Sequence, residues 1–495
     1  MRSNTLLIRA DAGGKLGTGH VMRMLALAQA WIARGGEVHF ASIRCPVALR
    51  DRLKNCGITF HSMNDYPLGS DDDCRELMHL LKEYDIQFVA LDNYHFQEQY
   101  QDNINSSSTT VLVVADYQHV RMWHADLVLN QNLQSTGTES EYAFAETGEA
   151  LLGAPFVLLR DEFLLNPRVE TSESEVGPLR VLITFGGVDP PAATLDVLRA
   201  LEFYQTPLHI RVLAGPANPR IEEIKELANL SSHEVEVIQF SLDMPTMYQW
   251  ADRVISAAGS SCYEWMFLKR AGWVTPIAEN QDEVAAAFRE KKLAYVESAE
   301  TVKDPQRLAR SLAEWLPSAS PGSLPLIDGY GSQRICAKLD RSEIWLRPLQ
   351  PETDLEETYR LATDPTVRKA SFNDQDISIE EHRSWLHQVD SDEQSKVYVV
   401  QTGISTFVGV VRFHNVVKDL WEIGISISKE MRGKGAAKNA IRLGIAKMNI
   451  LHPALSYQAL IKSENRGSQF LFSQLGFKQV AQVQSRQTWL RKYRQ

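Results

Sequence analysis

Short apolar runs alternate with segments of helical periodicity through the first part of the chain. The apolar runs predict strands at residues 5–10, 37–42, 88–92, 110–116 and 126–131. Between them, residues 22–35 and 74–84 repeat apolar side chains with the helical period, which predicts helices. Strands that alternate with helices in this way are typical of a parallel, doubly wound sheet.

The same alternation begins again after a polar, turn-rich stretch at residues 166–179, which reads as a linker. Further apolar runs predict strands at residues 180–187, 208–215, 235–240 and 252–259. Two similar α/β halves in tandem predict a cleft between them, because open α/β sheets bind ligands at the carboxyl ends of their strands. We expect the first domain at residues 1–165 and the second at residues 179–338.

A break rich in proline, glycine and serine at residues 316–332 precedes a different pattern. Strands are predicted at residues 343–349, 395–402, 405–415 and 420–428, with few helices between the later ones. This pattern predicts an α+β domain with a largely antiparallel sheet over residues 341–495. The expected fold class is therefore α/β, with two tandem Rossmann-like domains followed by an α+β domain.

Composition narrows the partners and the compartment. The net charge of −10 argues against non-specific binding to nucleic acid or to an anionic membrane. The five cysteines are scattered and form no C-x-x-C pair, which argues against a disulfide framework or a zinc site. No signal peptide and no apolar run long enough to cross a bilayer is evident. We expect a cytoplasmic protein, and its oligomeric state stays open.

A histidine at the mouth of the first predicted helix is the first catalytic candidate. The opening strand leads through Asp11 to Gly17, Gly19 and His20, and Arg23 follows three positions later. Free backbone N–H groups and the positive end of the helix dipole favour an anion there and disfavour a charged imidazolium. A neutral His20 can accept a proton near pH 7. A hydrogen bond from the ring to a loop carbonyl is the structural alternative.

Two glycine turns in the second half are candidates for binding phosphate. ITFGGVDP places Gly187 after a predicted strand, and SAAGSSCYEW places Gly259, Ser260 and Ser261 at the start of a predicted helix. Backbone N–H groups and the serine hydroxyls can hold a diphosphate there. Glu264, one turn further on, can accept hydrogen bonds from a ribose diol. The alternatives are a structural β–α turn and an ordinary helix N-cap.

A series of motifs occurs in one order across residues 4–337: RADAGGKLGTGHVMR, LDNYHF, ADLVLNQN, LLGAPFVLLRDEF, ITFGGVDP, SAAGSSCYEW, AENQ and IDGYGSQRI. Together they resemble the UDP-sugar hydrolases of pseudaminic acid biosynthesis, which are relatives of the two-domain (GT-B) nucleotide-sugar glycosyltransferases. The resemblance implies removal of UDP from UDP-2,4-diacetamido-2,4,6-trideoxy-β-L-altropyranose. Water would attack the anomeric carbon with inversion.

The resemblance also implies roles for individual residues. His20 would be the general base that activates the water, and Glu264 and Asn280 would bind the substrate. The full set of candidates for binding UDP and the sugar is Asp11, Gly17, Gly19, Arg23, Arg160, Gly187, Gly259, Ser260, Ser261, Glu264, Asn280 and Gln281, and Asp92 and Tyr94 lie in matching stretches. UDP is a good leaving group and one base suffices for inversion, so we expect no metal.

A glycine-rich loop in the last domain is a second candidate site. It follows a predicted strand, precedes a predicted helix, and consists of Arg432, Gly433, Lys434, Gly435, Ala436 and Ala437. Small residues let consecutive N–H groups close on a pyrophosphate, and the two cationic side chains add positive charge. A glycine-rich turn in solvent is the structural alternative.

This loop resembles the acetyl-CoA pyrophosphate loop, R-G-x-G-x-A, of the GNAT acetyltransferases. The stretches IWLRPLQPETDLEETYRLATDP and SENRGSQFLFSQLGFKQV also resemble that family, over about residues 343–492. The resemblance implies acetyl-CoA as co-substrate. Besides the loop, its candidate ligands are Ile425, Ile427, Asn465 and Ser468.

The chemistry of acetyl transfer leaves two questions open. Phe472 occupies the position that is often tyrosine in this family, the acid for the leaving CoA thiolate. The thiolate can leave without an acid, or Ser473 or water can serve as donor. Glu422, on the strand before the loop, is the candidate base for an incoming ammonium, with a solvated strand residue as its alternative.

The two resemblances together predict a bifunctional enzyme of pseudaminic acid biosynthesis. It would acetylate the 4-amino group of a UDP-amino-sugar and hydrolyse the product to UDP and free sugar. Four alternatives stay open: a legionaminic-type sugar, a true glycosyltransferase with a sugar or peptidoglycan acceptor, an acetyl-CoA sensor that regulates the hydrolase, and an acetyltransferase for proteins or antibiotics.

Overall fold

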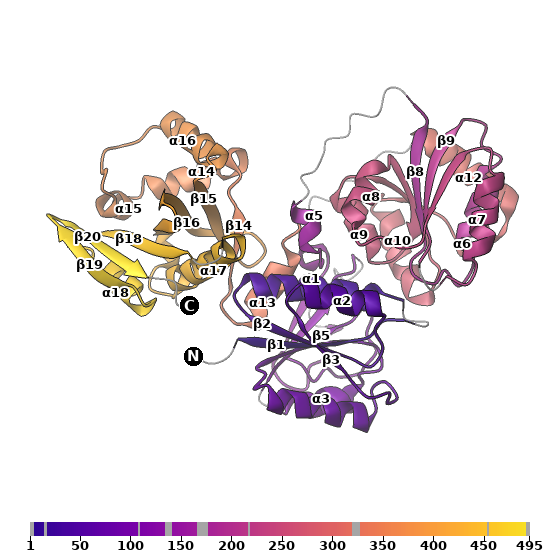
Figure 1. The fold of residues 1–495 in the computed structure, drawn as a ribbon, viewed down its shortest axis with the longest axis horizontal. Coiled ribbons are helices and arrows are strands. Elements are labelled where there is room, and N and C mark those ends of the chain that lie inside the picture. The colour runs from indigo at the N-terminus through magenta and orange to yellow at the C-terminus, as the bar shows by residue number, and fades with distance from the viewer. Residues whose placement is uncertain are drawn as a thin grey trace. The chain divides into compact units, whose positions relative to one another are not determined.

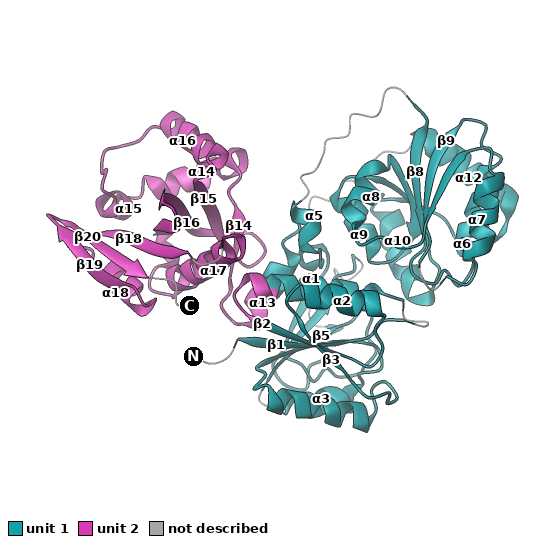
Figure 2. Ribbon diagram, viewed as in Figure 1, with its two compact units in different colours: residues 1–30, 37–335 teal, residues 31–36, 336–495 magenta. Residues whose placement is uncertain are grey.

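A computed structural model describes residues 4–13, 17–106, 109–133, 141–165, 177–215, 218–318, 327–452 and 455–491. Residues 166–176 of the first predicted linker and residues 319–326 of the second break lie outside the described residues. The chain divides into two compact units (Figure 2). Unit 1 comprises residues 1–30 and 37–335, and unit 2 comprises residues 31–36 and 336–495.

The first half of unit 1 is built on a seven-stranded parallel sheet with the order β3-β2-β1-β4-β5-β6-β7. Its strands are β1 (Thr5–Ala10), β2 (Glu37–Ser42), β3 (Thr59–Ser62), β4 (Phe88–Asp92), β5 (Thr110–Val114), β6 (Leu127–Asn130) and β7 (Glu149–Leu152). The helices are α1 (Gly19–Ala33), α2 (Val47–Asn55), α3 (Asp71–Glu83), α4 (Glu98–Asn105) and α5 (Asp161–Leu165), with a short η3 (Ala154–Phe156). Figure 1 shows α1 and α2 on one side of this sheet and α3 on the other.

The second half of unit 1 has a six-stranded parallel sheet with the order β10-β9-β8-β11-β12-β13. Its strands are β8 (Leu179–Thr184), β9 (Leu208–Leu213), β10 (Glu234–Ile238), β11 (Arg253–Ala257), β12 (Ala271–Thr275) and β13 (Tyr295–Val296). Its helices are α6 (Ala193–Leu201), α7 (Ile221–Leu230), α8 (Met244–Trp250), α9 (Ser261–Phe267), α10 (Asp282–Glu290), α11 (Ala299–Lys303) and α12 (Pro305–Ser318), with η4 (Glu279–Gln281) before α10.

Both sheets reverse their strand order once, and this reversal fixes where a ligand can bind. In the first sheet the reversal lies between β1 and β4, and in the second it lies between β8 and β11. At such a point the loops after the two neighbouring strands diverge and leave a crevice at the carboxyl ends. The predicted glycine turns follow β1, β8 and β11, so the chain brings each of them to a crevice.

Unit 2 contains a seven-stranded mixed sheet with the order β14-β15-β16-β17-β18-β20-β19. The strands are β14 (Ile344–Pro348), β15 (Ser395–Thr402), β16 (Thr406–Val417), β17 (Leu420–Ile427), β18 (Ser456–Lys462), β19 (Lys478–Val483) and β20 (Arg486–Arg491). The helices are α13 (Gly331–Leu339), which crosses the unit boundary, α14 (Pro351–Ala362), α15 (Pro365–Ala370), α16 (Ile379–Ser391), η5 (Lys429–Met431), α17 (Ala436–Leu451) and α18 (Arg466–Gln474). Neighbouring strands are antiparallel except β17 and β18. The predicted fold class is confirmed.

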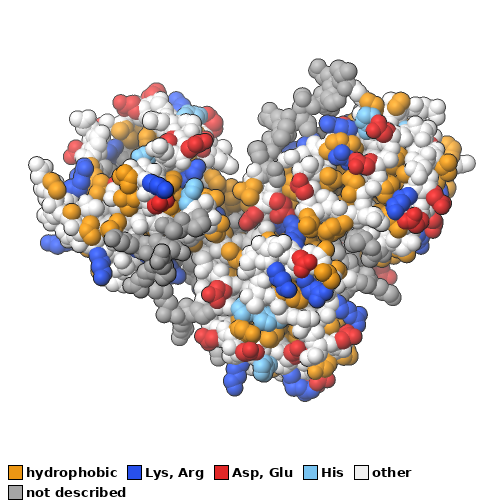
Figure 3. All heavy atoms as spheres, in the orientation of Figure 1, with side chains coloured by type: hydrophobic (Ala, Val, Ile, Leu, Met, Phe, Trp, Pro, Cys, Tyr) orange, Lys and Arg blue, Asp and Glu red, His pale blue; other side chains and the backbone are white. Residues whose placement is uncertain are grey.

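In the described part of the chain, no helix is both long and apolar enough to cross a bilayer. On the face shown in Figure 3, acidic and basic side chains are interspersed rather than gathered by sign.

A buried arginine holds the first sheet to α3. Arg9 lies in the middle of the sheet with no exposed surface. Its guanidinium donates to Asp73 on α3 at 3.1 and 3.2 Å and to Asp11 at 2.6 Å. Asp73 also accepts from the backbone N–H of Gly69 and from the hydroxyl of Tyr100. Buried charges are tolerated only when they are paired and hydrogen-bonded in this way.

We expect Asp73→Asn to lower the free energy of unfolding by about 3 kcal/mol, because it removes one of the two carboxylates that pair with the buried Arg9 charge. Urea unfolding measures this loss. The matched control is Asp72→Asn, since Asp72 is an exposed neighbour on the same helix turn and pairs with the exposed Arg75. Equal midpoints for the two variants would contradict the prediction.

Candidate active site

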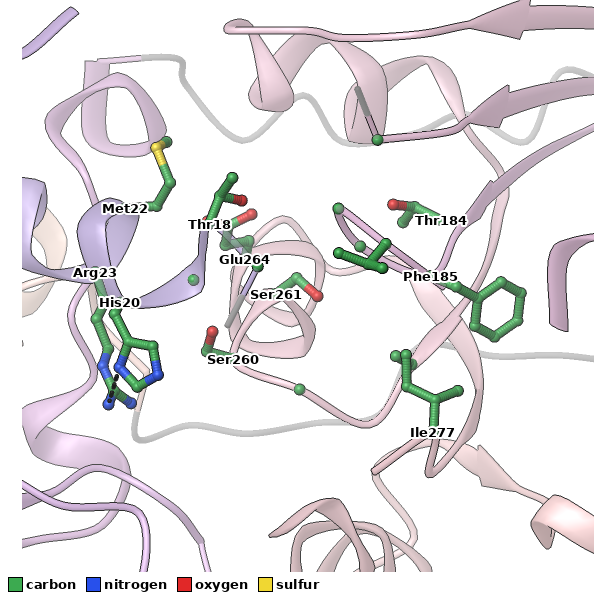
Figure 4. Close-up of a pocket in the computed structure, with 18 of the residues that line it drawn as sticks. Thr18, His20, Met22, Arg23, Thr184, Phe185, Ser260, Ser261, Glu264 and Ile277 are labelled. Atoms are coloured by element: carbon green, nitrogen blue, oxygen red, sulfur yellow. Dashed lines mark hydrogen bonds between the residues drawn. The ribbon is translucent and has the colours of Figure 1, made fainter. Parts of the chain in front are cut away.

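A cavity of about 970 Å³ lies in unit 1, lined by loops that follow β1, β4, β5, β8, β11 and β12. Figure 4 shows side chains of both halves around it. Eleven of the twelve predicted binding residues line it, together with His20: Gly17, Gly19, Arg23, Arg160, Gly187, Gly259, Ser260, Ser261, Glu264, Asn280 and Gln281. The sequence therefore identified residues from separate motifs that the fold brings to one cavity.

Asp11 is the predicted residue that the structure does not bring to the cavity. Its side chain has no exposed surface. One oxygen accepts from the hydroxyl of Ser42 and from the backbone N–H groups of Ile43 and Arg44, and the other accepts from Arg9. The carboxylate therefore connects the end of β1 to the end of β2. This geometry indicates a structural role for Asp11 rather than contact with a ligand.

A carboxylate orients the imidazole of His20. The Nδ1 atom of His20 lies 2.7 Å from Oδ1 of Asp92, the last residue of β4. A terminal nitrogen of Arg23 also lies 3.2 Å from Nδ1, but the carboxylate is closer and can only accept. We therefore assign the proton to Nδ1 and the lone pair to Nε2. His20 is 9% exposed, and among the cavity's side chains in Figure 4 it lies beside Arg23 at the first-half wall.

Arg23 clamps the carboxylate that holds His20. Its Nε and one terminal nitrogen donate to the two oxygens of Asp92 at 2.7 and 2.5 Å, and its other terminal nitrogen donates to Asp116 at 2.7 Å. Burial alone would raise the pKa of Asp92, but Arg23, through its charge and its hydrogen bonds, together with His20, outweighs burial and lowers the pKa well below its usual range. Asp92 therefore stays ionised beside the imidazole.

Asp116 is a site residue that the sequence analysis did not select. It follows β5 as Asp92 ends β4, so both carboxylates meet at one edge of the sheet. Burial would raise its pKa, and Arg23 lowers it overall. The predicted strand TVLVVAD ends in an aspartate, and aspartates also stand at the ends of the strands that lead to Asp11 and Asp92. This repeated ending is the sequence signal that could have identified Asp116.

Tyr94 connects this cluster to the second half of unit 1. Its hydroxyl donates to Asp116 and accepts from Nδ2 of Asn280 at 3.4 Å. Its ring meets the ring of His20 edge to face, with centroids 5.3 Å apart. Burial, followed by the negative charge of Asp116, raises the pKa of Tyr94 far above its usual range, so the phenol stays protonated.

Glycines let the two halves approach closely near His20. A Cβ atom on Gly187 would lie 3.8 Å from the Cα of Gly17, and a Cβ atom on Gly215 would lie only 2.3 Å from the Cα of Gly187. Any side chain at Gly215 would therefore displace the backbone of the Gly187 turn. In the same turn, Asp189 accepts from the N–H groups of Ala193 and Thr194 and so caps α6.

The serine turn after β11 leaves its hydroxyls available to a ligand. Ser260 occupies the N-cap position of α9, yet its side chain makes no capping bond. The Ser260 side chain therefore does not act as an ordinary helix N-cap. Gln281 braces the turn, because its Oε1 accepts from the N–H of Ile277 at 3.0 Å and its Nε2 lies 3.6 Å from where a Cβ of Gly259 would be.

Arg160 and Glu264 form an ion pair at the cavity, 2.8 Å apart. Arg160 also donates to Glu162 at 2.6 Å, while its second terminal nitrogen is buried and has no partner within the described residues. Burial raises the pKa of Glu264, and Arg160 offsets part of that rise. Both residues line the cavity, so the pair can offer N–H donors and a carboxylate acceptor to a ligand there.

The glycine-rich loop of unit 2 has the geometry of an anion-binding helix start. Gly433 and Gly435 have φ angles of +77° and +84°, which glycine adopts without strain. Gly435 is the N-cap of the 16-residue helix α17 and offers no side-chain cap. The first N–H groups of α17 are therefore open to a ligand.

The strand before this loop is unpaired along one edge. β17 and β18 pair only from Leu420 to Glu422, opposite Ser456 to Gln458, although β17 continues to Ile427. The backbone from Ile423 onward, which includes the predicted Ile425 and Ile427, is thus left open on the β18 side. An extended amide-containing ligand can hydrogen-bond there, and the arm of acetyl-CoA is such a ligand.

Other predicted residues around the loop have structural partners. The guanidinium of Arg432 donates to the carbonyl of Ile427 and pairs with Asp364 at 2.9 Å, so it fixes the loop. Asn465 caps α18 by accepting from the N–H of Ser468 at 3.0 Å. Lys434, Ala436 and Ala437 lie at the loop as predicted, and Lys434 is exposed.

Phe472 is buried, with 3% of its surface exposed, and packs edge to face against Phe477. Ser473 is exposed and donates to the carbonyl of Phe470. Glu422 is half-buried, and its Oε2 accepts from Gln458 at 2.9 Å at the point where β17 and β18 part. As for metals, the described residues contain no group of three or more histidine, cysteine, aspartate or glutamate side chains that could hold one.

Two family models match the chain. Residues 191–320 match the glycosyltransferase family 28 C-terminal domain, and residues 343–478 match the acetyltransferase (GNAT) domain. Among solved structures, MurG of Acinetobacter baumannii is 17% identical and covers 68% of this chain and 99% of its own, with a TM-score of 0.44. The spermidine N-acetyltransferase of Vibrio cholerae in complex with CoA and spermine is 21% identical and covers 30% of this chain and 94% of its own, with a TM-score of 0.27.

Curated relatives cover either one unit or the whole chain. The UDP-2,4-diacetamido-2,4,6-trideoxy-beta-L-altropyranose hydrolase of Campylobacter jejuni is 22% identical over 288 residues, 58% of this chain and 96% of that protein. An uncharacterised protein of Methanocaldococcus jannaschii is 21% identical over 485 residues, 96% of this chain and 97% of that protein. Both predicted resemblances are confirmed: the chain joins a region similar to this UDP-sugar hydrolase, with a glycosyltransferase family 28 C-terminal domain, to a GNAT acetyltransferase domain.

Proposed function

We propose that unit 1 hydrolyses a UDP-sugar with His20 as the general base. The observation that carries the proposal is the hydrogen bond from Nδ1 of His20 to Asp92, which leaves Nε2 as the basic nitrogen at a cavity lined by both halves. A general base needs a lone pair directed at the reacting group and a partner that fixes its tautomer. The similarity to the Campylobacter jejuni hydrolase supports the reaction class.

In the proposed step, Nε2 of His20 removes a proton from a water molecule whose oxygen attacks the anomeric carbon. The bond between that carbon and the phosphate oxygen breaks, and UDP leaves with the electron pair. Attack from the face opposite the leaving group inverts the configuration. Asp92 stabilises the imidazolium that forms, since its lowered pKa keeps it ionised.

The second half would hold UDP. Gly259, Ser260 and Ser261 would offer N–H groups and serine hydroxyls to the diphosphate, and the Ser260 hydroxyl makes no capping bond to α9. Glu264 would accept from the ribose hydroxyls, with Arg160 as its ion-pair partner. Asn280 would reach the sugar, because it already lies at hydrogen-bonding distance from Tyr94 beside the base.

For unit 2 we propose acetyl-CoA-dependent acetylation of the 4-amino group of the precursor UDP-sugar. Glu422 would take the proton of the ammonium, the amine would attack the thioester carbonyl, and the C–S bond would break to release the CoA thiolate. The open edge of β17 and the start of α17 fit the co-substrate. An acetyl-CoA sensor is the competing role, because Phe472 cannot donate a proton.

One NMR time course with a UDP-4-amino-sugar and acetyl-CoA tests both activities. We expect N-acetylation first, then UDP release without an added acceptor, then free sugar of inverted configuration. UDP release that requires a sugar acceptor would indicate a glycosyltransferase. A legionaminic-type UDP-sugar, run in parallel, distinguishes the alternative substrate.

His20→Ala should lower kcat for UDP release by about 10²- to 10⁴-fold, because the variant lacks the base. UDP binding, measured by calorimetry, should change little since the diphosphate is held by the second half. A variant with an unchanged kcat would exclude His20 as the base. His119→Ala serves as a control on a nearby histidine that does not line the cavity.

Asp92→Asn should lower stability by an amount that depends on pH. The pKa of Asp92 is lower in the folded chain than its ordinary value of 3.8, so the ionised carboxylate stabilises the fold at pH values above 3.8. That contribution is lost as the pH falls through the folded-state pKa. Unfolding by urea should therefore show a wild-type advantage at pH 7 that shrinks below about pH 4. An advantage that is constant with pH would contradict this account.

Gly435→Glu should abolish acetyl-CoA binding, because a carboxylate would stand at the start of α17 and a side chain is strained at a φ of +84°. Hydrolysis of substrate that is already acetylated should continue. Gly403→Glu is the matched control, since Gly403 also has a positive φ and open space around it, in the turn between β15 and β16. Loss of both activities in folded Gly435→Glu would show that the units are not functionally independent.

A further inference from the structure

One face of the unit 2 sheet carries a line of polar side chains next to Glu422. Strand register places Arg412 opposite Gly424 and His414 opposite Glu422, and Glu422 lies opposite Gln458. Side chains of directly opposed residues share a face. We call these five residues the acceptor face. The other face is apolar there, with Phe413 opposite Ile423 and in contact with α17 at Gly444.

We propose that Arg412 binds a phosphate of the acceptor, so that unit 2 acetylates an amine carried by a phosphorylated molecule and disfavours polyamines. This inference rests on the proposed acetyl transfer, with Glu422 as its base, and names the class of acceptor. It concerns only unit 2.

The guanidinium of Arg412 is held in place by its surroundings. Its Cζ lies 5.7 Å from the centroid of the Trp385 ring on α16. A Cβ atom at position 424 would lie 3.0 Å from one terminal nitrogen and 3.1 Å from Nε, so the guanidinium occupies the space that Gly424 leaves. Because the group is already positioned, less side-chain entropy is lost when it binds an anion.

The charge of Arg412 has no carboxylate partner within ion-pairing distance in the described part of the chain, and the residue is exposed. Burial lowers the pKa of Arg412, and the negative charge of Glu422 offsets part of that effect. Glu422 itself accepts a hydrogen bond from Gln458. Burial, and then the positive charge of Arg412, lowers the pKa of the neighbouring His382, which keeps that imidazole neutral. Arg412 is therefore available for an anionic ligand.

The spacing on the acceptor face suits a molecule with an amine at one end and a phosphate at the other. Gly424, under the guanidinium, lies two residues beyond Glu422 on the same strand, about 7 Å away. An amine at Glu422 thus places the rest of the acceptor near Arg412. A guanidinium binds phosphate through parallel N–H donors, whereas a second ammonium of a polyamine would be repelled there.

The test compares three acceptors in the full chain: a UDP-4-amino-sugar, the same amino sugar without UDP, and spermine. CoA thiol release gives kcat and KM for each. Wild type should prefer the UDP-sugar. Arg412→Ala should raise KM for the UDP-sugar by about 10-fold or more, with a smaller change in kcat and little change for the uncharged sugar.

Two further variants separate the charge from the position of Arg412. Arg412→Lys should recover part of the loss, because it keeps a cation without the planar fork. Gly424→Ala should raise KM for the UDP-sugar by displacing the guanidinium while leaving every charge in place. Arg360→Ala, an exposed arginine on α14 that pairs with Glu357, is the control and should behave as wild type.

The outcomes distinguish this inference from the proposed function. Equal effects of Arg412→Ala on the UDP-sugar and on the stripped sugar, or a wild type that prefers spermine, would overturn the role of Arg412 while leaving acetyl transfer intact. A wild type that binds acetyl-CoA yet acetylates none of the three amines would instead overturn the proposed acetyl transfer, and this inference with it.

Discussion

The pairing of one arginine with two carboxylates determines the proposed hydrolytic site. Asp92 and Asp116 stand at the ends of neighbouring parallel strands, where the buried charge of Asp92 and the partly buried charge of Asp116 would repel each other. Arg23, from the first turn of α1, donates to both and makes it possible for both to stay ionised. With Asp92 ionised and fixed, His20 has one tautomer and one orientation. The proposed base therefore depends on the ion pairs of Arg23 with Asp92 and Asp116.

The positions of the glycines in unit 1 follow from the order of the strands in its two sheets. Each sheet of unit 1 reverses its strand order once, and the turns after β1, β8 and β11 lie where the order reverses. The Gly187 turn contacts Gly17 of the first half, and within the second half it packs so closely on Gly215 that no side chain fits at Gly215. Unit 2 also leaves backbone groups open to a ligand, but by another route. There β17 and β18 stop pairing after Glu422, which exposes the β17 backbone beside the start of α17.

The sequence predicted what repeats locally and missed what depends on distant partners. Buried central strands and the apolar face of α1 have clear periodicity, whereas the edge strand β3 and the two-residue β13 do not. Asp11, Asp92 and Asp116 all follow or end apolar strands and look alike in sequence. Only the fold shows that Asp11 bonds to the β2 loop while the other two bond to Arg23, since Arg23 and Asp116 are separated by 93 positions. Arg412 was missed because its significance comes from Gly424 and Trp385 on other elements.

Phe472 shows how packing and chemistry compete for one position. Its ring lies in the core of unit 2 against Phe477. A tyrosine hydroxyl buried in that environment without a partner would cost about 1–3 kcal/mol, so phenylalanine suits the packing better. The chemical loss is smaller than it first looks, because an ordinary thiol has a pKa of about 8.5 and a thiolate is a stable leaving group near neutral pH. Acetyl transfer then depends mainly on a base for the ammonium and on the position of the acceptor, which are the roles proposed for Glu422 and Arg412.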